Sequence, residues 1–150
     1  MKKTAIILFA LFLLGACVPN SGQSADSSDE AILFVTIGDI QETFALKDLE
    51  ALPSDVVDFN GVLYEGVTIS TLLEAVSVNP DTLKALKAVA SDGYSVNYDP
   101  AQILKDDVLV AYALADGTSL SADDGNFRMV LPDEEGKLNL RMLAELQILQ

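Results

Sequence analysis

Few side chains in this chain of 150 residues could carry chemistry. It has one thiol, Cys17, no histidine, and two arginines, Arg128 and Arg141. Without histidine, neither a Ser-His-Asp nor a Cys-His nucleophilic apparatus can be assembled, and histidine-based zinc sites are excluded. The 23 acidic residues make close carboxylate pairs expected by chance, and such pairs typically belong to a solvated surface. We therefore predict no catalytic residue and no metal site.

Arg128 is the first candidate for binding a ligand. It lies in an apolar segment, 127–131, that reads as a strand of an acidic protein. A guanidinium fixed in this way can bind a carboxylate or a phosphate. The alternative, which we favour, is a structural ion pair with a nearby loop acid such as Asp92 or Asp124.

Cys17 closes the run Leu14-Gly15-Ala16-Cys17, directly behind a basic start and the apolar segment 4–14. That segment has the length of a secretory signal and is too short to span a bilayer. The run resembles the lipobox of bacterial lipoproteins, in which the thiol is alkylated by a diacylglyceryl group before cleavage. A plain secretory signal with an incidental cysteine is the alternative. The resemblance implies a signal peptide at 1–16 and a Cys17 that carries acyl chains such as palmitate.

Residues 18–30 are rich in Ser, Asp and Gly and poor in apolar side chains. They cannot bury enough surface to offset the entropy of ordering, so we predict that lipidated Cys17 and this segment form a flexible tether over 17–30. One domain is expected at 31–150. Two or more acyl chains give lasting attachment, since each buried CH₂ contributes ~0.8 kcal/mol. The expected location is the cell envelope, outside the cytoplasm and anchored to a membrane.

The formal net charge is −14, and removal of Lys2 and Lys3 with the signal takes it to −16. The remaining Lys and Arg residues are scattered, whereas nucleic acids are bound by clustered cations. We therefore expect no nucleic-acid partner. The acidic loops also lack the Asp-x-Asp-x-Asp-Gly spacing of a calcium loop. The expected partners are the membrane, through the lipid, and a small-molecule ligand or a partner envelope protein.

Apolar alternation and turn residues predict strands at 32–37, 41–45, 56–59, 62–64, 88–90, 95–98, 108–114, 127–131 and 143–149. Asn60-Gly61 predicts a hairpin turn between two of them. Helical spacing predicts short helices at 46–51, at 68–75 with Ser70 capping or beginning the helix, and at 100–104, with a further helical turn at 80–86. The fold class is therefore α+β, a single mixed-sheet domain with several short helices.

Four segments then occur in a known order: GVTISTLL at 66–73, SDGY at 91–94, LVAYALADGTSL at 109–120 and GNFRMVLP at 125–132. They resemble the Gly-Val helix start, the Ser-x-Asp-Gly-Tyr turn, the Asn-Gly-x-Pro-Leu stretch and the Gly-x-Pro-x-Arg-x-Val-x-Pro strand of one family. That family is the molybdopterin-binding domain of sulfite oxidases and related bacterial oxidoreductases. The resemblance covers about 46–150 and implies its fold and a redox ancestry.

The chain departs from this family where the metal is held. In catalytic members a cysteine thiolate ligates molybdenum just ahead of the Gly-Val helix, in a segment that here reads VDFNGV at 57–62. Neither Asn60 nor Asp58 is equivalent to a soft thiolate. An anionic pterin and an oxyanion substrate both require convergent cationic or imidazole groups. This chain has only two arginines and no histidine to supply them. We expect no cofactor, with molybdopterin as the alternative.

Aromatic residues could line what remains of such a pocket. Tyr64, with Phe59, is placed to line its mouth, although hairpin aromatics more often pack on a core. Tyr94 and Tyr98 have the same parity and could share a face with Arg128. The predicted ligand-binding residues are therefore Arg128, Tyr94, Tyr64 and Asn60.

Two functions follow from these observations. The first is a surface-tethered, non-catalytic binding or accessory module that keeps the fold without the metal. The second is a redox component of a molybdopterin-dependent oxidoreductase system. We favour the first because of the missing cysteine, the acidic surface and the lipid anchor.

Overall fold

The computed structural model describes residues 30–150. The predicted signal peptide (1–16), Cys17 and all but the last residue of the predicted tether lie outside the described residues. Among residues 30–150, no helix is long and apolar enough to cross a membrane.

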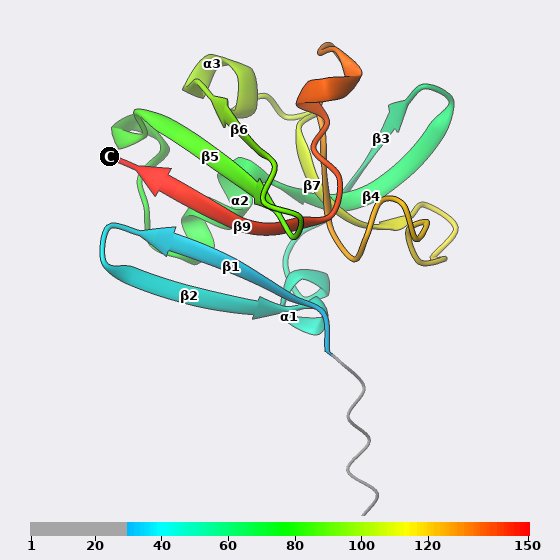
Figure 1. Ribbon diagram of the computed structural model, residues 1–150, viewed down its shortest axis with the longest axis horizontal. Helices are drawn as coiled ribbons and strands as arrows, with labels where there is room; N and C mark the ends of the chain where they lie inside the picture. Colours follow the sequence, from blue (N-terminus) through cyan, green and yellow to red (C-terminus); the bar gives the residue numbers. More distant parts are fainter. Residues whose placement is uncertain (1–29) are drawn as a thin grey trace, which may run out of the picture.

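The larger sheet has five strands in the order β2-β1-β9-β5-β6 (Figure 1). Their bounds are β1 Ile32–Ile37, β2 Ile40–Ala45, β9 Leu143–Leu149, β5 Ala85–Ala90 and β6 Ser95–Tyr98. Its central pair, β1 and β9, is parallel and joins the two ends of the domain, while the other pairs are antiparallel. Buried and less buried residues alternate along β5, as expected for a strand with one face on the core.

The smaller sheet has four antiparallel strands in the order β3-β4-β7-β8. These are β3 Asp55–Phe59, β4 Val62–Thr68, β7 Leu109–Leu114 and β8 Arg128–Val130. Asn60 and Gly61 have φ angles of 56° and 81°, both in the left-handed region that a two-residue hairpin turn requires. The hairpin predicted from Asn60-Gly61 is confirmed, and it projects from one end of the fold (Figure 1).

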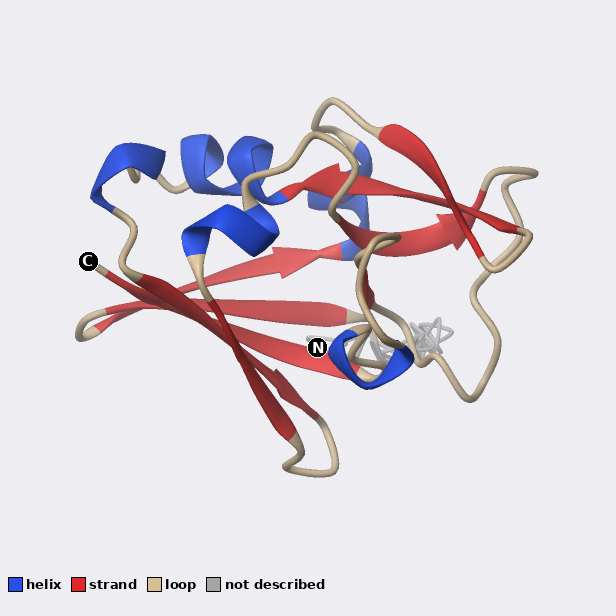
Figure 2. Cartoon of the chain, turned by 90° about the horizontal axis from the view of Figure 1, so that it is seen from above, coloured by secondary structure: helices blue, strands red, loops and turns tan. Residues whose placement is uncertain are grey.

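Short helices connect these strands. They are α1 Leu46–Glu50, α2 Ile69–Ala75 and α3 Pro100–Ile103, with 3₁₀ turns η1 Pro80–Thr82 and η2 Gly136–Leu138. Most of the helical turns gather on one side of the long strands (Figure 2). The apolar face of α2, formed by Ile69, Leu72 and Leu73, is buried in the core with Leu33 of β1 and Leu146 of β9. Burial of these side chains supplies the main driving force for folding.

The α+β fold class is confirmed, and its strands divide between two sheets. Two local predictions are wrong. Thr68, not Ser70, caps α2, because its extended backbone lets Oγ1 accept a hydrogen bond from the N–H of Thr71 at 3.1 Å. The helical turn predicted at 80–86 ends at Thr82, because Leu86 is a buried β5 residue paired with Tyr98 and Ile148.

Gly66 allows β4 to approach β7 closely at a register shift that precedes α2. A Cβ atom there would lie 2.2 Å from the carbonyl oxygen of Val110 and 2.6 Å from Cα of Ala111. Both neighbours are backbone atoms of an adjacent strand and cannot rotate away. The glycine of the Gly-Val motif is therefore a packing requirement of the sheet.

We predict that Gly66→Ala destabilises the domain by about 3 kcal/mol, because the added methyl group forces β4 and β7 apart. Urea unfolding followed by circular dichroism measures this change. Gly136→Ala is the matched control, since a Cβ atom there meets nothing within 4 Å. Equal stability of the two variants would show that the sheet tolerates a wider separation of β4 and β7.

Candidate functional site

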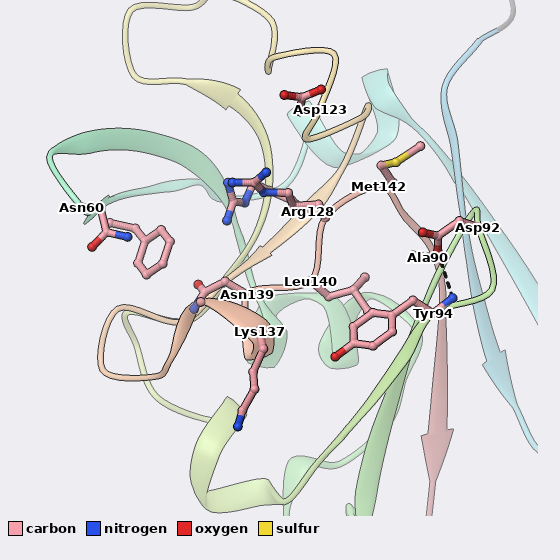
Figure 3. A pocket seen from close by; sticks show the side chains of 13 residues that line it. Asn60, Ala90, Asp92, Tyr94, Asp123, Arg128, Lys137, Asn139, Leu140 and Met142 are labelled. Carbon is pink, nitrogen blue, oxygen red and sulfur yellow. Dashed lines mark hydrogen bonds between the residues drawn. The ribbon is translucent and has the colours of Figure 1, made fainter.

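A pocket of about 560 Å³ opens where turns of both sheets meet. The β3–β4 turn contributes Asn60, the β5–β6 turn contributes Asp92 and Tyr94, and the smaller sheet contributes Arg128. Another wall is formed by η2, which includes Lys137, and by the chain that leads from η2 to β9. In Figure 3, Asn60 and Tyr94 lie on opposite sides of the pocket, with Arg128 between them and Lys137 below.

Arg128 is almost completely buried at the base of this pocket, with 2% of its surface exposed. Its Nη1 donates to Asp124 Oδ1 at 2.7 Å and to the Tyr64 hydroxyl at 2.9 Å, and its Nε donates to the Met129 carbonyl at 3.4 Å. The guanidinium carbon lies 4.7 Å from the ring centroid of Tyr64 and 5.6 Å from that of Phe59. Hydrogen bonds, an ion pair and cation–π contacts together hold the cation in one position.

The structure therefore confirms a structural ion pair of Arg128, and its partner is Asp124. Asp92 instead stabilises the turn between β5 and β6, because its Oδ1 accepts a hydrogen bond from the N–H of Tyr94 at 2.9 Å. Asp124 Oδ1 also lies 3.3 Å from Nε of Arg141, and Asp124 Oδ2 accepts from Ser121 Oγ at 2.9 Å. Sequence reasoning did not connect Arg141 with Arg128, although they are the only arginines.

Of the four predicted ligand-binding residues, Asn60, Tyr94 and Arg128 line the pocket, and Tyr64 contacts Arg128 behind it. Tyr94 is 53% exposed at the rim. Tyr98 does not share that position: it is buried, and its hydroxyl donates to the Leu138 carbonyl at 2.5 Å. Burial raises the pKa of the Tyr98 phenol above the ordinary tyrosine value.

Met142 was missed by sequence reasoning because nothing local marks it. Its φ of 52° lies in the left-handed region, which is unusual for a long side chain. Its N–H donates to the Asp124 carbonyl at 2.7 Å, and its carbonyl accepts from the N–H of Ser91 at 2.9 Å. These bonds to two distant loops hold the strained backbone of Met142, a residue that lines both this pocket and a smaller one beside Gly125.

Lys137 was also missed, and it lies on the rim. Its ammonium group is 3.0 Å from Glu135, and both side chains are largely exposed. The hydrogen bond and the charge of Glu135 raise the pKa of Lys137. Asn139 holds this wall in place, since its side chain accepts from the N–H of Leu131 at 2.6 Å and donates to the Leu131 carbonyl at 3.1 Å.

We predict that Asp124→Asn destabilises the domain by about 3–5 kcal/mol, because it leaves the buried guanidinium of Arg128 without a counter-charge. The free energy of unfolding, measured in urea, tests this. Asp123→Asn is the matched control: its side chain is exposed, so a change within about 0.5 kcal/mol is expected. A small effect at both positions would mean that Arg128 does not depend on Asp124.

Comparisons with known proteins agree with this architecture. Residues 38–150 match the family described as the oxidoreductase molybdopterin binding domain. No curated protein matches the sequence. Among solved structures, the fold is similar to that of the sulfane dehydrogenase SoxCD from Paracoccus pantotrophus, with a TM-score of 0.65 and 22% sequence identity.

That similarity covers 78% of this chain and 37% of the SoxCD chain, so this chain corresponds to little more than a third of its length. At this identity the likeness concerns the fold. The family match, in contrast, extends over both sheets except β1, and it includes the Gly-Val helix start and the arginine-bearing strand β8. The chain therefore belongs to the oxidoreductase molybdopterin-binding domain family.

Proposed function

We propose that this protein is a membrane-anchored lipoprotein of the bacterial cell envelope whose domain is a non-catalytic binding module. The observation that carries this proposal is which side chains the pocket contains and how they are paired. Its buried cation is held by Asp124 and Tyr64 of the same chain, and no thiol is present in the whole sequence from residue 18 onward. The domain keeps the fold of its family without the thiolate that the family's catalytic members use.

The residues of the pocket do not fit a molybdenum cofactor held by a thiolate. In the segment that precedes the Gly-Val helix, the residues that line the pocket are Phe59 and Asn60, and neither a phenyl ring nor a carboxamide replaces a soft anionic sulfur ligand. Among residues 30–150, no group of three or more His, Cys, Asp or Glu side chains is arranged to hold a metal ion. We therefore derive no reaction step through a molybdenum centre.

The pocket remains suited to binding. Its volume of about 560 Å³ falls in the range of ~300–1,000 Å³ that is usual for small-molecule sites. Its walls combine aromatic, aliphatic and charged side chains from turns of both sheets. Turns held by a rigid scaffold are where binding residues concentrate. A small molecule, or a side chain of a partner envelope protein, is the proposed occupant.

The lipid anchor supplies the location of this module. With Cys17 acylated, the segment that ends at Glu30 connects the membrane to β1. The net charge of −14 disfavours adsorption of the domain itself to anionic lipids. Attachment through the lipid thus leaves the pocket free to meet a ligand in the surrounding space.

We predict that the full-length protein, extracted natively from a molybdate-supplied bacterial host without chelators, contains no stoichiometric molybdenum and no releasable pterin. Metal analysis and the absorption spectrum measure both. A molybdenum enzyme purified from the same host serves as the positive control. Stoichiometric molybdenum or pterin in this protein would contradict the non-catalytic function and favour a redox component.

We also predict that the protein incorporates labelled palmitate and partitions into the detergent phase, and that Cys17→Ser abolishes both, because the thiol is the acylated group. Metabolic labelling with phase separation tests this. Ser24→Ala, a hydroxyl change elsewhere in the same segment, is the control and keeps the label. Label retained in Cys17→Ser would refute the lipid anchor without bearing on the pocket.

A further inference from the structure

We propose that the pocket binds a small organic monocarboxylate, with its carboxylate on Arg128 and Arg141 and its apolar body against Tyr94. This inference rests on the proposed binding function and gives it a ligand class. Four observations carry it: two guanidinium groups that share one carboxylate, a guanidinium nitrogen that donates to no other described residue, an exposed apolar wall and two acids that restrict the ligand's charge.

The positive charge arises because two guanidinium groups converge on one carboxylate. Asp124 Oδ1 is 2.7 Å from Nη1 of Arg128 and 3.3 Å from Nε of Arg141. These three side chains together carry a charge of +1, and Asp92 and Asp123 line other parts of the same pocket. In a chain of net charge −14, this is a local attraction for an anion, strengthened by the burial of Arg128 and Asp124.

The guanidinium of Arg128 also has a nitrogen to offer. Its hydrogen bonds to the rest of residues 30–150 use Nη1 and Nε. No fully buried side-chain nitrogen or oxygen in this part of the chain lacks a partner. Nη2 therefore keeps some exposed surface, and we assign that surface to the pocket that Arg128 lines. A donor fixed by its neighbours binds a carboxylate with little further loss of conformational entropy.

Arg141 completes the anion site from the rim. Its side chain is 61% exposed, and Nε is the atom that approaches Asp124. Because the side chain is largely exposed and Arg141 lines the pocket, its terminal nitrogens remain accessible to a ligand there. A carboxylate can accept from both arginines at once, because its two oxygens accept independently.

The apolar wall gives the ligand its second property. Tyr94 is 53% exposed and Met142 is 39% exposed, and both are among the large apolar side chains left open on the surface. Both line the pocket, and so does the apolar Leu140. Exposed apolar side chains gathered at one cavity mark a binding surface. An inorganic oxyanion would leave this wall unused.

Two acids limit the ligand to a single negative charge. Asp92 and Asp123 also line the pocket, and Glu135 already pairs with Lys137 on the rim. A second carboxylate on the ligand would face these acids at a loss of Coulomb energy. A monocarboxylate with an aromatic or aliphatic body fits all of these groups.

Titration of benzoate into the detergent-solubilised full-length protein, followed by ligand-observed NMR, tests the inference. Benzamide, sulfate and terephthalate are the neutral, inorganic and dianionic comparators. Saturable benzoate binding, stronger than that of all three, is expected. Arg141→Gln should weaken it by about tenfold, the effect of losing one charge-assisted hydrogen bond, and Tyr94→Ala should weaken it independently.

Lys47→Gln is the matched control, because Lys47 is also an exposed cation paired with an acid, Glu30, and lies outside the pocket. Benzoate affinity unchanged in Lys47→Gln and lowered in Arg141→Gln supports the site. No saturable benzoate binding, equal binding of benzamide or sulfate, or full affinity in Arg141→Gln overturns it. Those results leave the non-catalytic function standing, whereas that function fails separately if the protein carries molybdenum or a pterin.

Discussion

The buried ion pair between Arg128 and Asp124 is the interaction on which the arrangement of the pocket depends. A guanidinium that is 2% exposed is stable only if it is paired and hydrogen-bonded. Asp124 therefore lies beside Arg128 of β8, and the hydroxyl of Tyr64 in β4 accepts a hydrogen bond from the same guanidinium nitrogen. The Asp124 carbonyl then accepts from the N–H of Met142, at the entry to β9. One charge pair thus links the smaller sheet to the central strand of the larger one.

The same pair supports the proposal that the pocket binds a ligand without redox chemistry. Nη1 and Nε of Arg128 already donate hydrogen bonds within the domain. Only part of its hydrogen-bonding capacity is therefore left for a ligand. What remains is one donor at the base, a second arginine at the rim and an apolar wall, all held by turns between rigid strands. These groups can orient a ligand, whereas the redox chemistry of the family requires a soft metal ligand that residues 18–150 do not contain.

Local signals predicted much of the fold. The strands at 32–37, 95–98 and 143–149 have the predicted bounds, because alternating apolar residues and turn residues act over a few neighbours. The segment 80–86 failed for the opposite reason. Pro80 starts a helical turn, but Leu86 pairs with residues of β6 and β9. Such tertiary pairing overrides the local helical preference.

The sequence by itself determined the α+β class, the Asn60-Gly61 hairpin, the acidic surface and the absence of thiol and imidazole ligands from the domain. It also carried the family resemblance, since four short segments in order are properties of the chain alone. Only the tertiary structure decided that Asp124 rather than Asp92 pairs with Arg128, that Arg141 shares this carboxylate, and that Met142 comes to line the pocket. These contacts depend on how the two sheets are brought together. Arg128 and Tyr64 are separated by 64 positions, and no local pattern encodes a contact of that range.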